Sequence, residues 1–317
     1  MYGQVDTNKE REKDMNTATK LSAYGAAIAL ITGGGYAIGT TVGPLSAAAP
    51  SGHASTHGHT GASAAADQPA GLTSSRGGYT LTPTGSALTP GATSDFSYRI
   101  EGPGGAPVTA FDVEHNKRMH LIVVRRDTTG FQHLHPVMAP DGTWSVPLSV
   151  PSAGSYRVFA DFTLNGGPAM TLGIDVPAPG PYQPVQHSPS RVAHVDGYTV
   201  ELTGELVPGR ESPVTLAVSK DGAPVTDLQP YLAAYGHLVA LREGDLAYLH
   251  VHPEGSPGDG RTPAGPTIRF VAEVPSAGSY RLFLDFQHNG VVRTAEFNVP
   301  TGAAPAAIHG APVRSST

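Results

Sequence analysis

Three histidines between Lys117 and Met138 have the spacing of metal ligands on a β-hairpin. His120 lies thirteen positions ahead of His133, and His133 and His135 form a His-x-His-Pro sequence. Imidazole nitrogen is a common ligand for zinc, copper, nickel and iron. Two histidines that are separated by one residue lie on the same side of a strand. The residue types and their spacing therefore predict a metal site, with a copper or zinc ion as the expected ligand.

The same spacing recurs in a second stretch, from Tyr235 to Pro253. His237 lies thirteen positions ahead of His250, and His250 and His252 again form a His-x-His-Pro sequence. Two such triads from unrelated causes would be a coincidence. We therefore expect one metal ion at each triad.

The spacing brings the three imidazoles of the first triad together only if the strands pair in the right register. The apolar run MHLIVV leads into a turn at residues 127–130 and then into FQHLHP. With that turn as the loop, Val124 pairs with His133 and Ile122 with His135. Opposed Cβ atoms lie about 4.5–5.5 Å apart and diagonal ones about 7–8 Å. All three rings then share one face, and a slip of one residue would separate them.

One carboxylate recurs beside each predicted triad. Asp161 and Asp285 occupy matching positions in the sequences SYRVFADF and SYRLFLDF. Each aspartate could be a fourth metal ligand or could orient an imidazole from behind. The alternative is a structural ion pair with a nearby arginine, Arg157 or Arg281.

Two further functions are compatible with repeated histidines. Imidazoles on a strand can form a hydrogen-bonded cluster that only stabilises a sandwich, in a structural module of the cell surface that displays its loops to a partner protein. A metal-dependent enzyme is the third class. No Ser/His/Asp or paired-carboxylate arrangement stands out by its spacing, so we do not expect an enzyme.

Composition excludes several other kinds of site. The chain has no cysteine, which rules out disulfides, thiolate metal sites and cysteine nucleophiles. Its net charge is -6 and it has no long basic run, so it lacks the clustered Lys and Arg that bind nucleic acid. Any transition-metal site must use His, carboxylate or Met.

The elements that position the histidines are short strands in two repeats of about 100 residues each. GGYTLTPTG opens the first repeat and DGYTVELTG the second, and PSAGSYRVFADF near the end of the first corresponds to PSAGSYRLFLDF in the second. Alternating residues and frequent Gly, Pro and Asp turns predict an all-β chain of two tandem immunoglobulin-like antiparallel β-sandwiches. Both sandwiches should follow an N-terminal transmembrane helix and a disordered linker.

The N-terminal part predicts a location outside the cytoplasm. No charged residue occurs from Leu21 to Gly43, and about 20 apolar residues span the hydrocarbon layer. We expect a single-pass anchor in the cell membrane with the bulk of the chain extracytoplasmic. The alternative is a secreted protein, cut near Ala49 after an Ala-x-Ala sequence.

The expected organisation has seven segments. They are a cytoplasmic tail (1–20), a transmembrane anchor (21–43), a disordered linker that contains His53, His57 and His59 (44–75), the first sandwich repeat (76–178), a Pro-rich spacer (179–193), the second repeat (194–300) and a disordered tail (301–317).

A family resemblance supports the metal-binding interpretation. HLIVVRRDTTGFQHLHP together with GTWSVPLSVPSAGSYRVFADF resembles a family of actinobacterial cell-envelope proteins that are associated with heavy metals. More remotely, it is similar to the YtkA-like and copper-resistance β-sandwich modules. The resemblance implies extracytoplasmic metal handling, and it covers residues 117–162 closely and the second repeat loosely.

Overall fold

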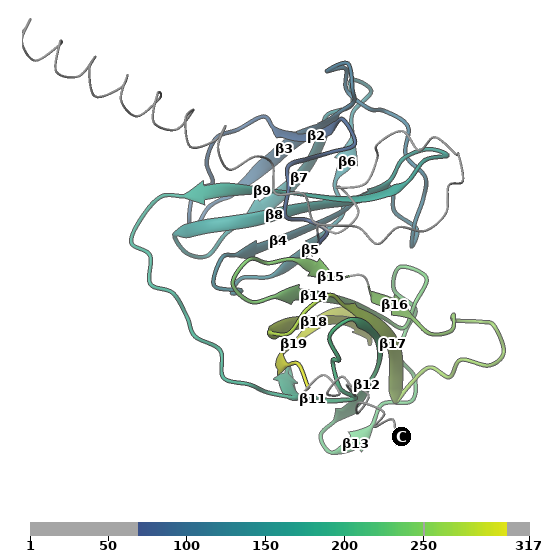
Figure 1. The fold of residues 1–317 in the computed structure, drawn as a ribbon. Coiled ribbons are helices and arrows are strands. Elements are labelled where there is room, and N and C mark those ends of the chain that lie inside the picture. The colour runs from purple at the N-terminus through teal and green to yellow at the C-terminus, as the bar shows by residue number, and fades with distance from the viewer. Residues whose placement is uncertain (1–68, 250, 303–317) are drawn as a thin grey trace, which may run out of the picture. The chain divides into compact units, whose positions relative to one another are not determined.

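The computed structural model describes residues 69–249 and 251–302, and every described element is a β-strand or a connection between strands (Figure 1). All of these residues belong to one unit, Ser63–Thr317. The predicted cytoplasmic tail, the membrane span at 21–43 and most of the linker and the C-terminal tail lie outside the described residues. In the described part of the chain, no helix is long and apolar enough to cross a bilayer.

The first sandwich, residues 75–178, consists of two antiparallel sheets. One sheet has the order β1 (Ser75–Arg76), β2 (Tyr79–Pro83), β3 (Thr93–Glu101), β7 (Trp144–Ser149) and β6 (Val137–Met138). The other has the order β5 (Gln132–Leu134), β4 (His120–Arg125), β8 (Gly154–Thr163) and β9 (Ala169–Ala178). This strand order is the ABED and C′CFG arrangement of immunoglobulin-like domains.

The second sandwich, residues 192–300, repeats the same topology. Its first sheet has the order β10 (Val192–Val195), β11 (Tyr198–Thr203), β12 (Arg210–Lys220), β17 (Thr267–Val274) and β16 (Val251–Pro253), with β13 (Ala223–Pro224) paired to β12. Its second sheet has the order β15 (Tyr248–Leu249), β14 (Gly236–Arg242), β18 (Ser279–His288) and β19 (Val291–Pro300). The predicted all-β, antiparallel, tandem sandwich architecture is confirmed.

A tyrosine fixes the same corner in each sandwich. The Tyr156 hydroxyl donates to the carbonyl of Ser152 at 2.8 Å, and the Tyr280 hydroxyl donates to the carbonyl of Ser276 at 2.8 Å. Both tyrosine side chains are buried in the sandwich cores. A tyrosine that bonds a carbonyl a few residues upstream is a hallmark of immunoglobulin-like folds, and here it explains the repeated PSAGSY sequence.

Replacing Tyr156 by Phe should lower the free energy of unfolding by about 0.5–1.5 kcal/mol, because the ring is kept while its half-buried hydrogen bond to the carbonyl of Ser152 is lost. Equilibrium urea denaturation measures this change. Tyr182→Phe, at a tyrosine that is 45% exposed, is the matched control and should leave the midpoint unchanged. Equal urea midpoints for the two variants would show that the hydrogen bond from Tyr156 to Ser152 does not stabilise the fold.

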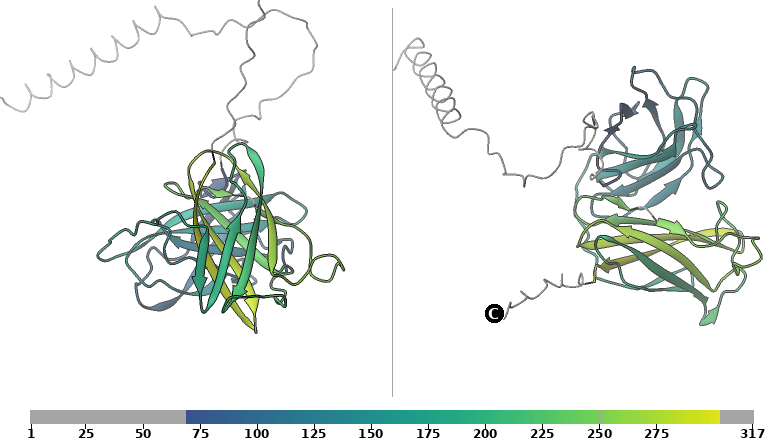
Figure 2. Two further views of the ribbon diagram at one scale, coloured as in Figure 1. Left: turned by 90° about the horizontal axis from the view of Figure 1, so that it is seen from below. Right: turned by 45° about the vertical axis from the view of Figure 1, so that its right-hand side comes forward.

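The two sandwiches pack against each other through their four-stranded sheets (Figure 1; Figure 2). An apolar layer lies between them, separate from the core of either sandwich. The ring of Phe131 stacks on that of Phe283 with centroids 4.0 Å apart and 4° between planes. Phe131 is half-buried, and the buried members of the layer are Ile122, Val124, Phe159, Val239, Leu241, Leu246 and Phe283.

This packing explains why β4 reads as a continuous apolar run. Leu121 and Val123 face the core of the first sandwich, while Ile122 and Val124 face the second sandwich. Every residue of β4 is buried as a result. The histidine-bearing face of β4 therefore does not face solvent, because it lies in the interface between the two repeats.

Residues 69–75 form part of the fold, which the sequence does not indicate. Residues 69–75 were expected in the disordered linker, but Gly71 N donates to the carbonyl of Thr171 at 3.0 Å. Tyr248 N, from the second sandwich, donates to the carbonyl of Ala70 at 3.0 Å. These contacts use backbone atoms, and residue composition does not reveal them.

The spacer between the repeats is also held by hydrogen bonds. Val185 N donates to the Asp127 carboxylate at 2.8 Å, and Asn298 Nδ2 donates to the carbonyl of His187 at 2.7 Å. The spacer thus contacts the hairpin turn of the first sandwich and the last strand of the second.

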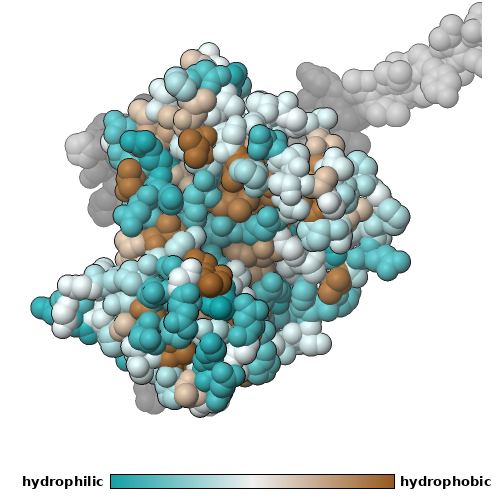
Figure 3. Space-filling view, turned by 180° about the vertical axis from the view of Figure 1, so that it is seen from behind, coloured by the Kyte–Doolittle hydropathy of each residue, from teal (hydrophilic) through white to brown (hydrophobic). Residues whose placement is uncertain are grey.

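On the face seen in Figure 3, apolar side chains form small groups among polar ones.

Candidate metal centre

Three histidines of the first hairpin meet at one end of the interface. His120, His133 and His135 each offer a ring nitrogen, and these three nitrogens lie within 4.8 Å of one another. The ring centroids are 5.3 Å apart for His120 and His133, 5.1 Å for His120 and His135, and 4.8 Å for His133 and His135. The structure therefore brings the first predicted triad together.

The strand register differs by two residues from the predicted one. Ile122 pairs with His133, whereas the expected partner of Ile122 was His135. The turn is tighter than residues 127–130, because Thr128 N donates to the carbonyl of Arg125 at 2.7 Å. Thr128 and Gly130 both adopt positive φ there, at 67° and 64°. A shift of two residues keeps the side chains on the same face, which is why the triad still converges.

Hydrogen bonds at the back of two rings set their tautomers. His120 Nε2 lies 3.2 Å from the carbonyl oxygen of Glu114, so Nε2 carries the proton and Nδ1 is left with its lone pair. His133 Nδ1 lies 2.9 Å from Oδ2 of Asp285, a carboxylate of the second sandwich. In the neutral ring, His133 Nε2 is then the atom with the lone pair.

Those two nitrogens face each other. His120 Nδ1 and His133 Nε2 are 3.0 Å apart. Two lone pairs at this distance repel, so the contact requires either a shared proton, which makes one ring an imidazolium, or a cation bound by both nitrogens. Tetrahedral zinc with bonds of about 2.0–2.1 Å places its nitrogen ligands about 3.3 Å apart. The observed spacing is close to that value.

The third ring supplies an atom whose bonding is incomplete. His135 Nε2 is buried and has no hydrogen-bond partner among the described residues. A buried polar atom without a partner costs about 1–3 kcal/mol. A metal ion between the three rings would satisfy it. The residues present therefore fit a bound transition-metal ion.

Burial favours the neutral form of His120, His135 and His237. It lowers the pKa of His120 to about 3, and repulsion from His133 adds to the shift. Burial also lowers the pKa of His135 to about 3 and that of His237 to about 4. Metal ligands must be deprotonated imidazoles, so these rings are in the ligating form at neutral pH.

The second predicted triad does not form on one hairpin. β15 pairs with β14 only through Tyr248 and Leu249, and the chain then crosses to the other sheet. His252 lies there on β16, opposite Val271, and its side chain is 64% exposed. Its Nε2 is 4.0 Å from a carboxylate oxygen of Glu273. The expectation that His237 and His252 share one face of one hairpin is wrong, and His250 lies outside the described residues.

His237 joins the first cluster across the interface. Its ring centroid is 6.2 Å from that of His133 and 5.2 Å from that of His115. His237 Nε2 donates to the carbonyl of Tyr231 at 2.9 Å, as His120 Nε2 does to that of Glu114. The two repeats therefore place one histidine each in equivalent settings.

A two-residue left-handed turn supplies the carbonyl in each repeat. In the first repeat the turn residues are His115 and Asn116, with φ of 47° and 64°; in the second they are Leu232 and Ala233, with φ of 52° and 62°. Such turns favour Asn and Gly, and the turn of the second repeat contains neither residue. The sequence reasoning missed His115, although Asn116 directly after it was a signal for this turn.

The two predicted aspartates lie opposite the first histidine of each repeat. Asp161 pairs with His120 across β4 and β8, and Asp285 pairs with His237 across β14 and β18. The arginines considered as their partners pair elsewhere: Arg157 contacts Asp175 at 3.4 Å, and Arg281 contacts Glu296 at 2.6 Å.

A cavity of about 90 Å³ reaches the cluster. It is lined by His115, His120, His133, Asp161 and His237, among others. Volume of this size admits water or an ion, so the imidazoles have a route to solvent-derived ligands.

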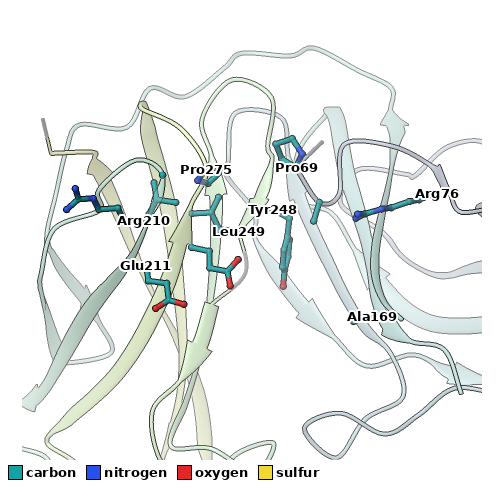
Figure 4. Close-up of a pocket in the computed structure, with 12 residues that line it drawn as sticks. Pro69, Arg76, Ala169, Arg210, Glu211, Tyr248, Leu249 and Pro275 are labelled. Carbon is teal, nitrogen blue, oxygen red and sulfur yellow. The ribbon is translucent and has the colours of Figure 1, made fainter. Parts of the chain in front are cut away.

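A larger cavity, of about 520 Å³, lies elsewhere, and no histidine lines it. Figure 4 shows Arg76 of the first sandwich and Arg210 of the second at opposite ends, with Tyr248 between them. Its charged side chains do not converge on one point, so we assign no ligand to it.

Solved structures resemble the chain only weakly. An Escherichia coli adhesin, FdeC, is 18% identical over 75% of this chain and 66% of its own, with a TM-score of 0.23. A putative membrane-anchored protein from Corynebacterium diphtheriae is 13% identical over 71% of this chain and 60% of its own, with a TM-score of 0.21. The chain thus spans less than two thirds of either structure. TM-scores this low add nothing to what the strand order shows.

Sequence comparison identifies the family. No curated protein sequence matches the chain. One family matches it twice, at residues 73–180 and 193–303, which together make up more than half of the chain. The chain therefore belongs to the family described as Domain of unknown function (DUF8832), of which it carries two copies.

Proposed function

We propose that the chain binds one transition-metal ion, zinc or copper, through His120, His133 and His135. The observation that carries the proposal is the convergence of one ring nitrogen from each of the three histidines within 4.8 Å. In addition, His135 Nε2 is buried without a hydrogen-bond partner among the described residues. Three imidazoles from one rigid hairpin suit Zn²⁺ or Cu²⁺. They leave a fourth coordination position to water or to an exchanging ligand.

The proposed setting is the outer side of a cell membrane. The uncharged run at residues 21–43 supports an anchor there, and the alternative remains secretion after cleavage near Ala49. In this proposal the chain handles metal and does not catalyse a reaction. Its partners are the metal ion and the membrane, and the resemblance to heavy-metal-associated envelope proteins agrees with this setting.

The metal content of the chain tests the proposal. The full chain, with His53, His57 and His59 of the linker changed to Ser, is loaded with excess Zn²⁺ or Cu²⁺, desalted and analysed by elemental mass spectrometry. We expect about one ion per chain, because the first triad is the histidine set that converges among the residues that the structure describes. Two ions would mean that the second histidine set also binds. A chain that retains neither metal would contradict the proposal.

A second candidate function is a hydrogen-bonded clamp between the sandwiches. It is favoured by the continuous chain of contacts from Glu114 through His120 and His133 to Asp285, at 3.2, 3.0 and 2.9 Å. In this case a proton shared between His120 Nδ1 and His133 Nε2 completes the chain of hydrogen bonds. Substitution of His133 would then lower the melting temperature by the same amount with or without added metal.

A further inference from the structure

We infer that Asp285 of the second sandwich positions the metal ligand His133 of the first, so that the metal site is completed only when the two sandwiches are docked. This inference rests on the proposed metal binding. It makes the tandem repeat one functional unit, since one repeat supplies the ligands and the other holds a ligand in place.

The contact between the two residues is well shielded. His133 Nδ1 and Asp285 Oδ2 are 2.9 Å apart, and the two side chains are 5% and 6% exposed. The other carboxylate oxygen of Asp285 accepts a hydrogen bond from Thr294 Oγ1 at 2.6 Å. Asp285 is thereby held on β18 with one oxygen aimed at His133.

A carboxylate behind an imidazole changes how that imidazole binds metal. It fixes the tautomer that leaves Nε2 free, fixes the orientation of the ring, and makes the ligating nitrogen more basic. Here His133 Nε2 is the nitrogen that faces His120 Nδ1 at 3.0 Å. The second sandwich therefore acts on the nitrogen that would bind the ion.

The repeats hold their equivalent aspartates in the same way. Asp161 of the first sandwich accepts from Thr171 at 2.8 Å, just as Asp285 accepts from Thr294. By the thirteen-residue spacing, the counterpart of His133 in the second repeat is His250, which lies outside the residues that the structure describes.

Docking depends on the apolar layer next to the site. Leu246 of the second sandwich is fully buried in that layer, together with Val124 and Phe283. If docking places Asp285 against His133, binding of the ion must in turn favour docking by the same free energy. Loosening the layer at Leu246 should therefore weaken metal binding without changing any ligand.

Zinc titration calorimetry on the full chain, with the linker residues His53, His57 and His59 changed to Ser, tests the inference. Asp285→Ala should weaken zinc binding about 10–100-fold, the usual effect of removing such a partner. Thr294→Val and Leu246→Ala should weaken it by smaller factors. Glu296→Gln removes one negative charge from the same sheet at a side chain that is 45% exposed and should leave the affinity unchanged.

A second readout separates positioning from general damage. Zinc should slow proteolysis of the spacer at residues 179–193 in the unsubstituted chain, and this protection should be much smaller in Asp285→Ala. Far-ultraviolet circular dichroism checks that the variant is folded. Asp285→Asn, which keeps the shape of the side chain, replaces Asp285→Ala if the latter unfolds, and should still weaken binding at least about threefold, since the lost charge reduces the basicity of His133.

The possible failures are distinguishable. Zinc binding by the unsubstituted chain with equal affinity in the folded Asp285 variant overturns the inference and leaves the proposed function standing. A chain that binds no zinc or copper overturns both. An equal loss of affinity in Glu296→Gln would show that net charge, and not the placement of Asp285, is the cause, which also overturns the inference.

Discussion

Replacing both His133 and His135 by Ala is expected to weaken zinc binding at least about 100-fold, because two of three ligands are lost and the loss of a single supporting partner already costs 10–100-fold. Both side chains belong to the triad whose nitrogens lie within 4.8 Å of one another. Isothermal titration of the full chain, with the linker histidines changed to Ser, gives the affinity directly.

The matched control for this prediction is His252→Ala. His252 also comes from a His-x-His-Pro sequence, but its side chain is 64% exposed on a different sheet. Its substitution should leave the affinity and the stoichiometry unchanged. If His252→Ala weakened binding as much as the double variant, the ion would not reside in the first triad.

Acid is expected to destabilise the metal-free chain steeply below about pH 6.5. His120, His135 and His237 have folded-state pKa values of about 3, 3 and 4, all below the value of about 6.5 for an unfolded histidine. The unfolded chain therefore binds more protons. The stability that these rings contribute is fully present above about pH 6.5 and is lost as the pH falls to about 3.

The slope of stability against pH measures this effect. Near pH 5, unfolding should take up about three protons, so the free energy of unfolding should fall by about 4 kcal/mol per pH unit. Urea denaturation at several pH values between 4.5 and 7 gives the slope, and His135→Ala should reduce the uptake by about one proton. A slope near zero would mean that the rings titrate alike in both states.

The convergence of the first triad could be predicted because it depends on parity alone. His120, His133 and His135 share a face in any register that differs from the true one by an even number of residues. The predicted turn was wrong by enough to shift the pairing by two residues, and Ile122 pairs with His133. The three histidines therefore share a face as predicted, although the predicted residue pairs are wrong.

The histidines of the second repeat do not share one hairpin because of a local difference in strand length, which their spacing in the sequence does not reveal. His250 and His252 follow β15, and β15 is only two residues long before the chain leaves β14. In the first hairpin the equivalent crossing to β6 comes later, after His135. Identical spacing of histidines therefore leads to different positions, because pairing with the other sheet begins at Val251 in the second repeat, before His252, and at Val137 in the first, after His135.

The cross-repeat contacts could not be predicted from the sequence. In the runs HLIVV and HLVAL apolar residues occupy both faces of the strand, yet an apolar outer face does not specify what covers it. The position of Asp285 against His133, separated by 152 residues, follows only from the docking of two sheets. The role of His237 in the same cluster follows from the same docking.

The most direct test of a metal centre in the first triad is anomalous X-ray scattering from crystals of the zinc-loaded chain, with data collected on both sides of the zinc edge. We expect one strong difference peak within about 2.0–2.1 Å of His120 Nδ1, His133 Nε2 and a ring nitrogen of His135. A peak at other residues, or no peak between these three rings at saturating zinc, would contradict the proposed site.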